Sequence, residues 1–300
     1  MVLAIAQTLL FLFGLPPVSR MYWDSIFAPM TKEAGNIFLI VGTAQAGLIL
    51  YNLVMLPIYY VQHPFFEQFK IQKDLPWPWL DEREHIRSRF WKLITRSMKF
   101  TFVNTFMVLP AMTALKVYFL DDLMGTPIKE SFFSTDDEHW PSTMKNITDL
   151  ICLTILHEFG FYVGHRLMHA KPFLYKYHKI HHEFKMNVTM AAQHNHTVDY
   201  FFSMATPALL ATSVVNPHSF TLFQWTIWVI VANLDDHAGY EFPWSPVRWF
   251  PLSAASDEHD FHHSKNLGCF ASKISIFNTL FGGYEAYDAR HVVMVGKKSE

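Results

Sequence analysis

The chain concentrates histidines at spacings that suit metal ligation. In the segment HRLMHAKPFLYKYHKIHH, His165 and His169 lie four residues apart, and His178, His181 and His182 form an i, i+3, i+4 set. On a helix, both spacings place the side chains on one face. Neutral imidazole is the commonest protein ligand for iron, zinc and copper, whereas a hydrophobic core gains nothing from five neighbouring imidazoles. The pattern therefore predicts a metal centre.

A third cluster and two single histidines extend this pattern. The segment HDFHH repeats the second spacing at His259, His262 and His263, and His196 and His237 bracket a long apolar run. The eight clustered histidines are too many for one ion, since a structural zinc site uses four ligands and a catalytic one three. Two metal ions are the natural count, and nitrogen-rich ligation with open positions suits iron in O2 chemistry.

Long apolar segments must position these histidines. Hydrophobic residues make up 51% of the 300 residues, and residues 34–66 and 200–234 contain no Asp, Glu, Lys or Arg. Because about 20 apolar residues span a bilayer, we expect an all-α fold, an integral membrane helical bundle. Residues 74–92, DLPWPWLDEREHIRSRFWK, are typical of a loop followed by an amphipathic interfacial helix. Membrane segments are predicted near 3–16, 36–61, 100–119 and 147–164.

Charge, cysteine content and one further motif exclude other classes. With 24 basic and 26 acidic residues, the chain lacks the electrostatic footprint of a nucleic-acid-binding protein. Cys152 and Cys269 are far apart in the sequence, which excludes a disulfide framework and zinc-finger spacing. The segment HEFGF does not fit the HExxH motif of zinc proteases. Its histidine, His157, lies about 80° from the face of His165 on a helix and is expected to be structural.

Loop charges predict the orientation of the chain. Residues 62–99 carry eight basic residues and residues 165–185 are also basic, whereas residues 121–146 are mainly acidic. The positive-inside rule makes the first two stretches cytosolic and the third lumenal or external. A single crossing by residues 200–234 would place the two single histidines about 30 Å apart, on opposite sides. We therefore expect this run to enter and return through a turn at its NPHS segment, which leaves a cytosolic histidine-rich di-metal domain.

The histidine boxes resemble those of the fatty acid hydroxylase/sterol desaturase superfamily, whose pattern is HxxxH, HxxHH and HxxHH with single histidines between. FYVGHRLMH looks like the FYxxHRxxH helix of this family, and YKYHKIHHEF is close to its second box. DDHAGYEFPW is similar to the HSGYxxPW segment of C4-methylsterol oxidases. Two stretches depart from those oxidases: residues 195–199 read NHTVD in place of AHPxE, and residues 266–272 read NLGCFAS in place of NxGNYAS.

The resemblance implies a membrane-bound non-haem di-iron enzyme that uses O2, with electrons from NAD(P)H delivered through cytochrome b5 and its reductase. In the C4-methylsterol branch, the reaction is stepwise oxidation of the 4α-methyl group of a 4-methylsterol toward a carboxylate. Asp236 and Glu258 adjoin ligand positions and would either orient imidazoles or be solvated loop charges. By position, the implied iron ligands are His165, His169, His178, His181, His182, His259, His262 and His263, with His196 and His237 as additional ligands.

Several alternatives stay open at this point. Within the superfamily, a sterol desaturase or a fatty-acyl or sphingolipid hydroxylase would carry the same boxes. A membrane metal transporter would need ionisable residues along a path at mid-membrane, whereas these histidines lie at segment ends. A non-catalytic regulator that keeps the fold is disfavoured because all three boxes are intact.

The implied location is the endoplasmic reticulum membrane, with several crossings and with the active site and C-terminus in the cytosol. The last residues, KKSE, place Lys297 and Lys298 where a dilysine retrieval signal would lie. We divide the chain into N-terminal membrane segments with an interfacial helix (1–146), a histidine-box catalytic domain (147–283) and a cytosolic C-terminal tail (284–300).

Overall fold

The computed structural model describes residues 2–245, 247 and 253–289. The described chain is predominantly helical, and its β pairing consists of two isolated bridges. The predicted all-α class is therefore confirmed. The predicted retrieval signal at Lys297 and Lys298 lies outside the described residues.

Within the described residues, five helical stretches are long and apolar enough to cross a membrane. They are built from α1 and α2 (Val2–Leu9 and Leu15–Phe27), α3 (Lys32–Val61), α5, α6 and α7 (Glu84–Val103, Leu109–Leu115 and Asp121–Leu123), α8 (Thr143–Ala170), and α10 and α11 (Thr197–Asp199 and Thr206–Val215). The other α-helices of the described chain are α4 (Pro64–Glu67), α9 (Pro172–His178), α12 (Ser219–Asp236), α13 (Ser256–Lys265) and α14 (Ile276–Phe281). Short 3-10 helices lie at Glu130–Phe133, His181–Glu183 and Thr189–Gln193.

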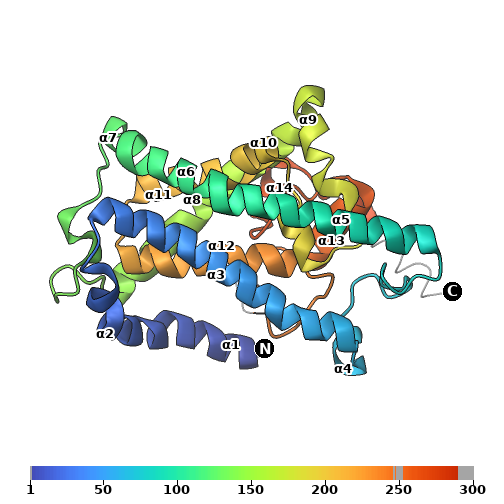
Figure 1. Ribbon diagram of the computed structural model, residues 1–300, viewed down its shortest axis with the longest axis horizontal. Helices are drawn as coiled ribbons and strands as arrows, with labels where there is room; N and C mark the ends of the chain where they lie inside the picture. Colours follow the sequence, from blue (N-terminus) through green and yellow to red (C-terminus); the bar gives the residue numbers. More distant parts are fainter. Residues whose placement is uncertain (1, 246, 248–252, 290–300) are drawn as a thin grey trace.

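The long helices run along one axis of the molecule, and the shorter ones that carry histidines gather toward one end. Figure 1 shows α3, α5, α8 and α12 extending along the long axis, with α9 and α13 toward the right. α12 packs against α3, and α11 packs against α8. The membrane-type helices therefore form a frame that presents the histidine-bearing segments at one end.

Two predicted membrane segments are longer than the sequence indicated. The segment near 3–16 continues to Phe27, and the predicted interfacial helix joins the segment near 100–119 in one helical stretch, Glu84–Leu123. A proline inside a helix lacks the N–H donor and crowds the preceding turn. A single π turn inserted before the proline is one way in which a helix accommodates it and continues. π-helical turns directly precede a proline-containing first turn at three places: Leu10–Gly14, Asn104–Val108 and Tyr200–Ala205.

The apolar run 200–234 forms the expected hairpin. Asn216 follows α11 in a left-handed conformation, with φ at 45°, a conformation that asparagine tolerates better than most residues. α12 begins at Ser219, and the Nδ1 atom of His218 caps it by accepting a hydrogen bond from Phe220 N at 3.1 Å. The chain thereby reverses and returns toward the end of the bundle from which it came.

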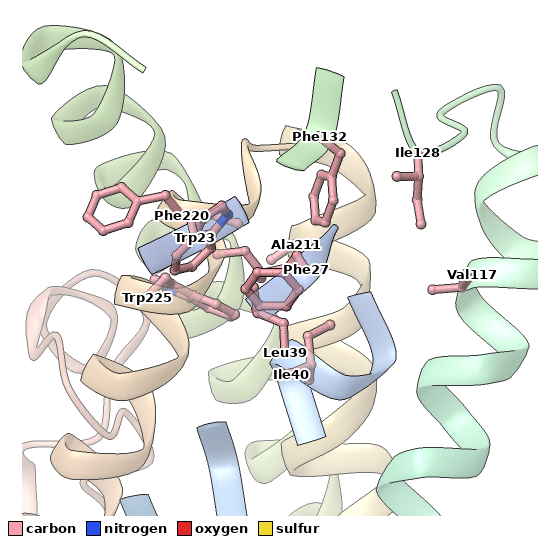
Figure 2. Close-up of a cluster of buried hydrophobic side chains, with 12 residues drawn as sticks. Trp23, Phe27, Leu39, Ile40, Val117, Ile128, Phe132, Ala211, Phe220 and Trp225 are labelled. Atoms are coloured by element: carbon pink, nitrogen blue, oxygen red, sulfur yellow. The ribbon is translucent and has the colours of Figure 1, made fainter. Parts of the chain in front are cut away.

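A hydrophobic core closes the end of the bundle opposite to α13 (Figures 1 and 2). Aromatic side chains of α2 and α12 meet there, including Trp23, Phe27 and Phe220. The ring of Phe27 stacks on Phe133 with the centroids 4.5 Å apart. Trp23 Nε1 donates to Ser219 Oγ at 3.0 Å, which satisfies the polar group of the indole inside the core. This packing fixes the start of α12, whose other end leads into the histidine cluster.

A buried ion pair lies in the third membrane-type helix and gives a test of how this helix packs against α11. Lys116 Nζ lies 2.7 Å from Asp121 Oδ2, and Ser213 Oγ donates to the other carboxylate oxygen at 2.7 Å. We expect Lys116→Met to lower the free energy of unfolding by about 3–5 kcal/mol, because it leaves a buried carboxylate without its counter-charge. Chemical unfolding in detergent micelles measures this change.

The matched control is Lys129→Met, at an exposed lysine, which should shift stability by about 0.5 kcal/mol or less. Combining Lys116→Met with Asp121→Leu should recover most of the loss, since both charges are then removed. Equal effects of Lys116→Met and Lys129→Met would contradict a structural role for the pair.

Candidate metal centre

Nine of the ten histidines that the sequence nominated converge into two groups. Within each group, the nitrogen atoms that could serve as ligands all lie within 4.8 Å of one another. The first group is His165, His169, His178, His182 and His262, and the second group is His181, His237, His259 and His263. The two groups adjoin each other, since the rings of His181 and His182 have centroids 5.7 Å apart.

Each group draws on several elements. His165 and His169 lie on the last turns of α8, and His178 ends α9. His181 and His182 belong to the 3-10 helix that follows. The remaining ligand candidates come from the residue after α12 and from α13. No single element holds a complete group, so the centre depends on the packing of the whole histidine-bearing end.

The two HxxHH boxes divide their histidines between the groups in opposite ways. The i, i+4 pair of the second box, His178 and His182, belongs to the first group, and His181 belongs to the second. In the third box the i, i+4 pair joins the second group instead, and His262 joins the first. On a helix, residues four apart differ by about 40° in direction, whereas residues three apart point about 60° to the other side. Each box therefore reaches both groups.

Hydrogen bonds at Nδ1 define the protonation of three of the five ligand candidates in the first group. His165 Nδ1 lies 2.8 Å from the carbonyl oxygen of Phe270, and His262 Nδ1 lies 2.6 Å from that of Gly268. His178 Nδ1 lies 2.9 Å from the carboxylate of Asp199. Carbonyl and carboxylate oxygens only accept hydrogen bonds, so each Nδ1 carries the proton and each Nε2 carries a lone pair.

These Nε2 lone pairs face one another. His165 Nε2 lies 3.1 Å from His178 Nε2 and 3.0 Å from His262 Nε2. Two unprotonated nitrogens at these distances cannot hydrogen-bond and repel each other, unless a cation lies between them. In the second group, His237 Nδ1 donates to Asn233 O at 2.7 Å, which leaves its Nε2 with a lone pair 2.9 Å from His259 Nε2. The donor set therefore fits metal ions in both groups.

Burial keeps these imidazoles neutral. Burial, reinforced by the neighbouring imidazoles, holds the pKa of five ligand candidates well below its usual value: His181, His182, His259, His262 and His263. Burial likewise lowers the pKa of His237 to about 4. Neutral imidazole is the form that ligates a metal, so the site is prepared for binding near pH 7.

His196 does not join either group. Its Nδ1 accepts a hydrogen bond from Val198 N at 3.1 Å, which caps α10, and its ring lies 4.7 Å from that of Tyr177. His157 also lies outside both groups, and its ring packs against Trp225 with the centroids 5.4 Å apart. The sequence pattern predicted that His196 is a ligand and that His157 is structural; the structure places both outside the two groups.

The sequence analysis missed the residue that orients His178. Asp199 is fully buried and bonds to the Nδ1 of that imidazole, as carboxylates often do behind metal-bound histidines. The signal was present, since Asp199 occupies the acidic position of the AHPxE pattern. Of the two acids that the sequence did nominate, Asp236 accepts from Ser272 Oγ and Glu258 accepts from the Tyr284 hydroxyl.

Comparison with known proteins agrees with this geometry. Residues 150–283 match the family model described as fatty acid hydroxylase. A very-long-chain aldehyde decarbonylase of Oryza sativa subsp. indica is 32% identical over 153 residues, 50% of this chain and 56% of that protein. Methylsterol monooxygenase 1 of Rattus norvegicus is 28% identical over 256 residues, 84% of this chain and 80% of that protein. Methylsterol monooxygenase 2-2 of Arabidopsis thaliana is 29% identical over 150 residues, 49% of this chain and 56% of that protein.

The chain thus spans about half the length of the rice and Arabidopsis relatives and most of the length of the rat one. No solved structure matches it. The resemblance to the fatty acid hydroxylase/sterol desaturase superfamily is confirmed by this match and by the relatives, and the match covers residues 150–283. This family comprises non-haem iron oxygenases, in agreement with the two histidine groups.

Iron content distinguishes the histidines inside the groups from those outside. We expect His262→Ala to lower the iron bound per chain, because it removes an Nε2 from the centre of the first group. His196→Ala should retain the wild-type iron content, since its ring faces Tyr177 instead. Metal analysis of the purified proteins in lipid nanodiscs measures both, and loss of iron from His196→Ala would restore that residue to the ligand set.

Proposed function

We propose that this protein is a membrane-bound non-haem di-iron oxygenase that oxidises a sterol, at the C4-methyl group of a 4-methylsterol. The observation that carries the proposal is the pair of adjoining histidine groups with facing Nε2 atoms, together with five helices of membrane-spanning length among the described residues. Each group supplies ligands for one ion. Iron bound there would supply the activation of O2 that unaided amino-acid side chains do not provide.

The residues of the chain prepare the site in three ways. Carbonyl oxygens and the Asp199 carboxylate hold three Nδ1 protons and aim the opposite nitrogens inward. Burial keeps the imidazoles neutral and excludes bulk water, which limits side reactions of an oxidising site. The ligand-bearing helix α8 is itself of membrane-spanning length, so an apolar substrate could reach the site from the bilayer.

The first oxidation step balances as a monooxygenation. One oxygen atom of O2 is inserted into a C–H bond of the methyl group to give a hydroxymethyl group. The other oxygen leaves as water, with two electrons and one proton supplied by NAD(P)H and one further proton from solvent. We propose cytochrome b5 and its reductase as the carriers of these electrons.

A sterol substrate is supported by the relatives and by one sequence segment. Two of the relatives described above are named methylsterol monooxygenases, and the DDHAGYEFPW segment is similar to that of C4-methylsterol oxidases. The rice relative is named a very-long-chain aldehyde decarbonylase, which makes a long-chain aldehyde the second substrate to test. The other candidates are a sterol desaturation and a fatty-acyl or sphingolipid hydroxylation.

We further propose that the protein lies in the endoplasmic reticulum membrane with the histidine groups on the cytosolic side. The basic residues of 62–99 and 165–185 support this orientation through the positive-inside rule. The division into N-terminal membrane segments (1–146), a catalytic domain (147–283) and a C-terminal tail (284–300) belongs to the same proposal.

A turnover assay tests the function. Iron-loaded protein in nanodiscs is supplied with cytochrome b5, its reductase, NADH and O2, together with a mixture of 4,4-dimethylsterol, other sterols, ceramide and a long-chain aldehyde. We expect loss of the 4,4-dimethylsterol and appearance of 4-hydroxymethyl and 4-carboxy products by mass spectrometry. His262→Ala, which removes a ligand candidate of the first group, is the control for turnover that depends on the histidine site.

The alternative outcomes are separable. A desaturated sterol, a hydroxylated acyl chain or a shortened hydrocarbon would retain the iron chemistry and replace the substrate. Absence of any product, with iron bound and the electron carriers active, would contradict an oxygenase and favour a non-catalytic regulator.

A further inference from the structure

A short segment after α13 contacts the imidazoles of the first histidine group. We call residues 268–274 the strap. Its Gly268 and Phe270 carbonyl oxygens accept the Nδ1 protons of His262 and His165. The Phe270 ring packs on the same two imidazoles and on His169, with centroids 5.2–5.8 Å apart. Among the described residues, the hydrogen bonds and ring contacts of the strap with imidazoles all go to the first group.

The conformation of the strap leaves its backbone N–H groups dependent on partners elsewhere. Gly268 and Cys269 are both left-handed, with φ at 56° and 48°, so this stretch is neither helix nor strand. Cys269 N donates to Gly283 O at 2.7 Å, and Ala271 N donates to the Asn278 side-chain oxygen at 3.0 Å. The strap is thus held from outside rather than by its own hydrogen bonds.

The anchor on the membrane side is Glu158 of α8. Its Oε2 accepts from Lys273 N at 2.8 Å and from Ile274 N at 3.2 Å. Glu158 precedes His165 by seven residues, which on an α-helix places both side chains on nearly the same face. One face of α8 therefore carries a ligand candidate and the anchor of the strap that orients it.

The charge of this anchor is matched inside the protein. Glu158 is fully buried within a membrane-type helix, and its Oε1 lies 3.4 Å from Lys273 Nζ and 3.3 Å from His157 Nδ1. A buried ion pair is a weak source of stability compared with apolar residues of similar volume. An ionisable residue at such a position in a membrane helix points to a functional requirement.

The second histidine group has separate support. His237 Nδ1 bonds to Asn233 O within α12. The strap also reaches the end of α12, because the Ser272 hydroxyl donates to Asp236 at 3.1 Å. This hydrogen bond does not involve the Nδ1 atom of His237 or its acceptor, Asn233 O. Loss of the Glu158 anchor should therefore affect the two groups unequally.

We propose that Glu158 is a positioning residue that orients imidazoles of the first histidine group through the strap. Its loss should weaken metal binding by the first group and not by the second. This inference rests on the proposed two-metal centre. Removing the anchor would free the Phe270 and Gly268 carbonyls, so His165 and His262 would lose the fixed tautomer and direction that ligation requires.

Cobalt(II) titration of metal-free protein in nanodiscs tests the inference, with the visible absorption of bound Co2+ as the readout. We expect the wild-type chain to bind two equivalents tightly. In Glu158→Leu, one equivalent should keep its affinity and the other should weaken by about 10–100-fold, with a changed absorption band, because partners behind metal ligands have effects of this size. Asn278→Ala, which removes the second anchor, should weaken the same equivalent.

Two further variants separate anchoring from charge. Glu158→Gln combined with Lys273→Met removes both charges but keeps a side-chain oxygen for the two strap N–H groups, so it should restore wild-type binding of both equivalents. The matched control is Asp149→Leu, which removes an acid from the same helix whose ion-pair partner is the exposed Lys145, and which should bind as the wild type does.

The outcomes distinguish this inference from the proposed function. If wild-type protein bound no Co2+, the two-metal centre itself would fail. If wild-type protein bound two equivalents and Glu158→Leu bound both with unchanged affinity, only the positioning role would be overturned. Equal weakening of both equivalents would also overturn it, because that result indicates a general loss of structure.

Discussion

The structure depends on one electrostatic constraint, the approach of unprotonated imidazole nitrogens to about 3 Å of one another. His165, His178 and His262 each have the Nδ1 proton committed to an oxygen, so their Nε2 lone pairs meet without a hydrogen between them. A protein core does not bring such groups together for packing, since lone pairs repel and buried polar groups need partners. A cation shared among the nitrogens turns this repulsion into attraction. The helices that surround the site are therefore best understood as the frame that holds these rings at ligation distance.

Each HxxHH box sends its i, i+4 pair to one histidine group and its remaining histidine to the other, and the two boxes do so in opposite ways. The HxxHH spacing therefore suits a two-metal site. With a four-residue pair and one intervening histidine, each box can send two rings to one ion and one ring to the other. The second box lies on the end of α9 and the following 3-10 helix, and the third box lies on α13, and the i, i+4 pairs of the two boxes go to different groups. Both groups thereby draw ligand candidates from both boxes, which places the two groups side by side.

The sequence predicted the parts of the structure that local spacing determines. The three boxes, the all-α class and the hairpin at Asn216 follow from helical periodicity, apolar runs and turn residues. The assignment of each histidine to one of the two groups could not be predicted in this way. His181 and His182 are adjacent in the sequence yet join different groups, and local spacing does not indicate which joins which. The assignment depends on how α8, α9 and α13 pack, which involves contacts between residues about 100 positions apart.

The single histidines show the same limit. His196 and His237 bracket the apolar run in equivalent ways, so spacing gave no reason to separate them. In the folded chain, His196 caps the first turn of α10 with its own ring nitrogen, while His237 follows α12 and faces His259. The first membrane segment was predicted too short for a related reason: a proline normally ends a helix, but this helix continues past its prolines after a π turn.

The buried acids near the site complete the physical account. Asp199 and Glu158 are fully buried in helices of membrane-spanning length, where an ionised carboxylate is unfavourable. Neither contributes apolar packing that leucine would not provide better. Asp199 bonds directly to an imidazole, and Glu158 bonds to the strap that bonds to two others. Both unfavourable features, the buried acids and the closely spaced imidazoles, thus serve one purpose. They present oriented, neutral nitrogen ligands inside a membrane protein.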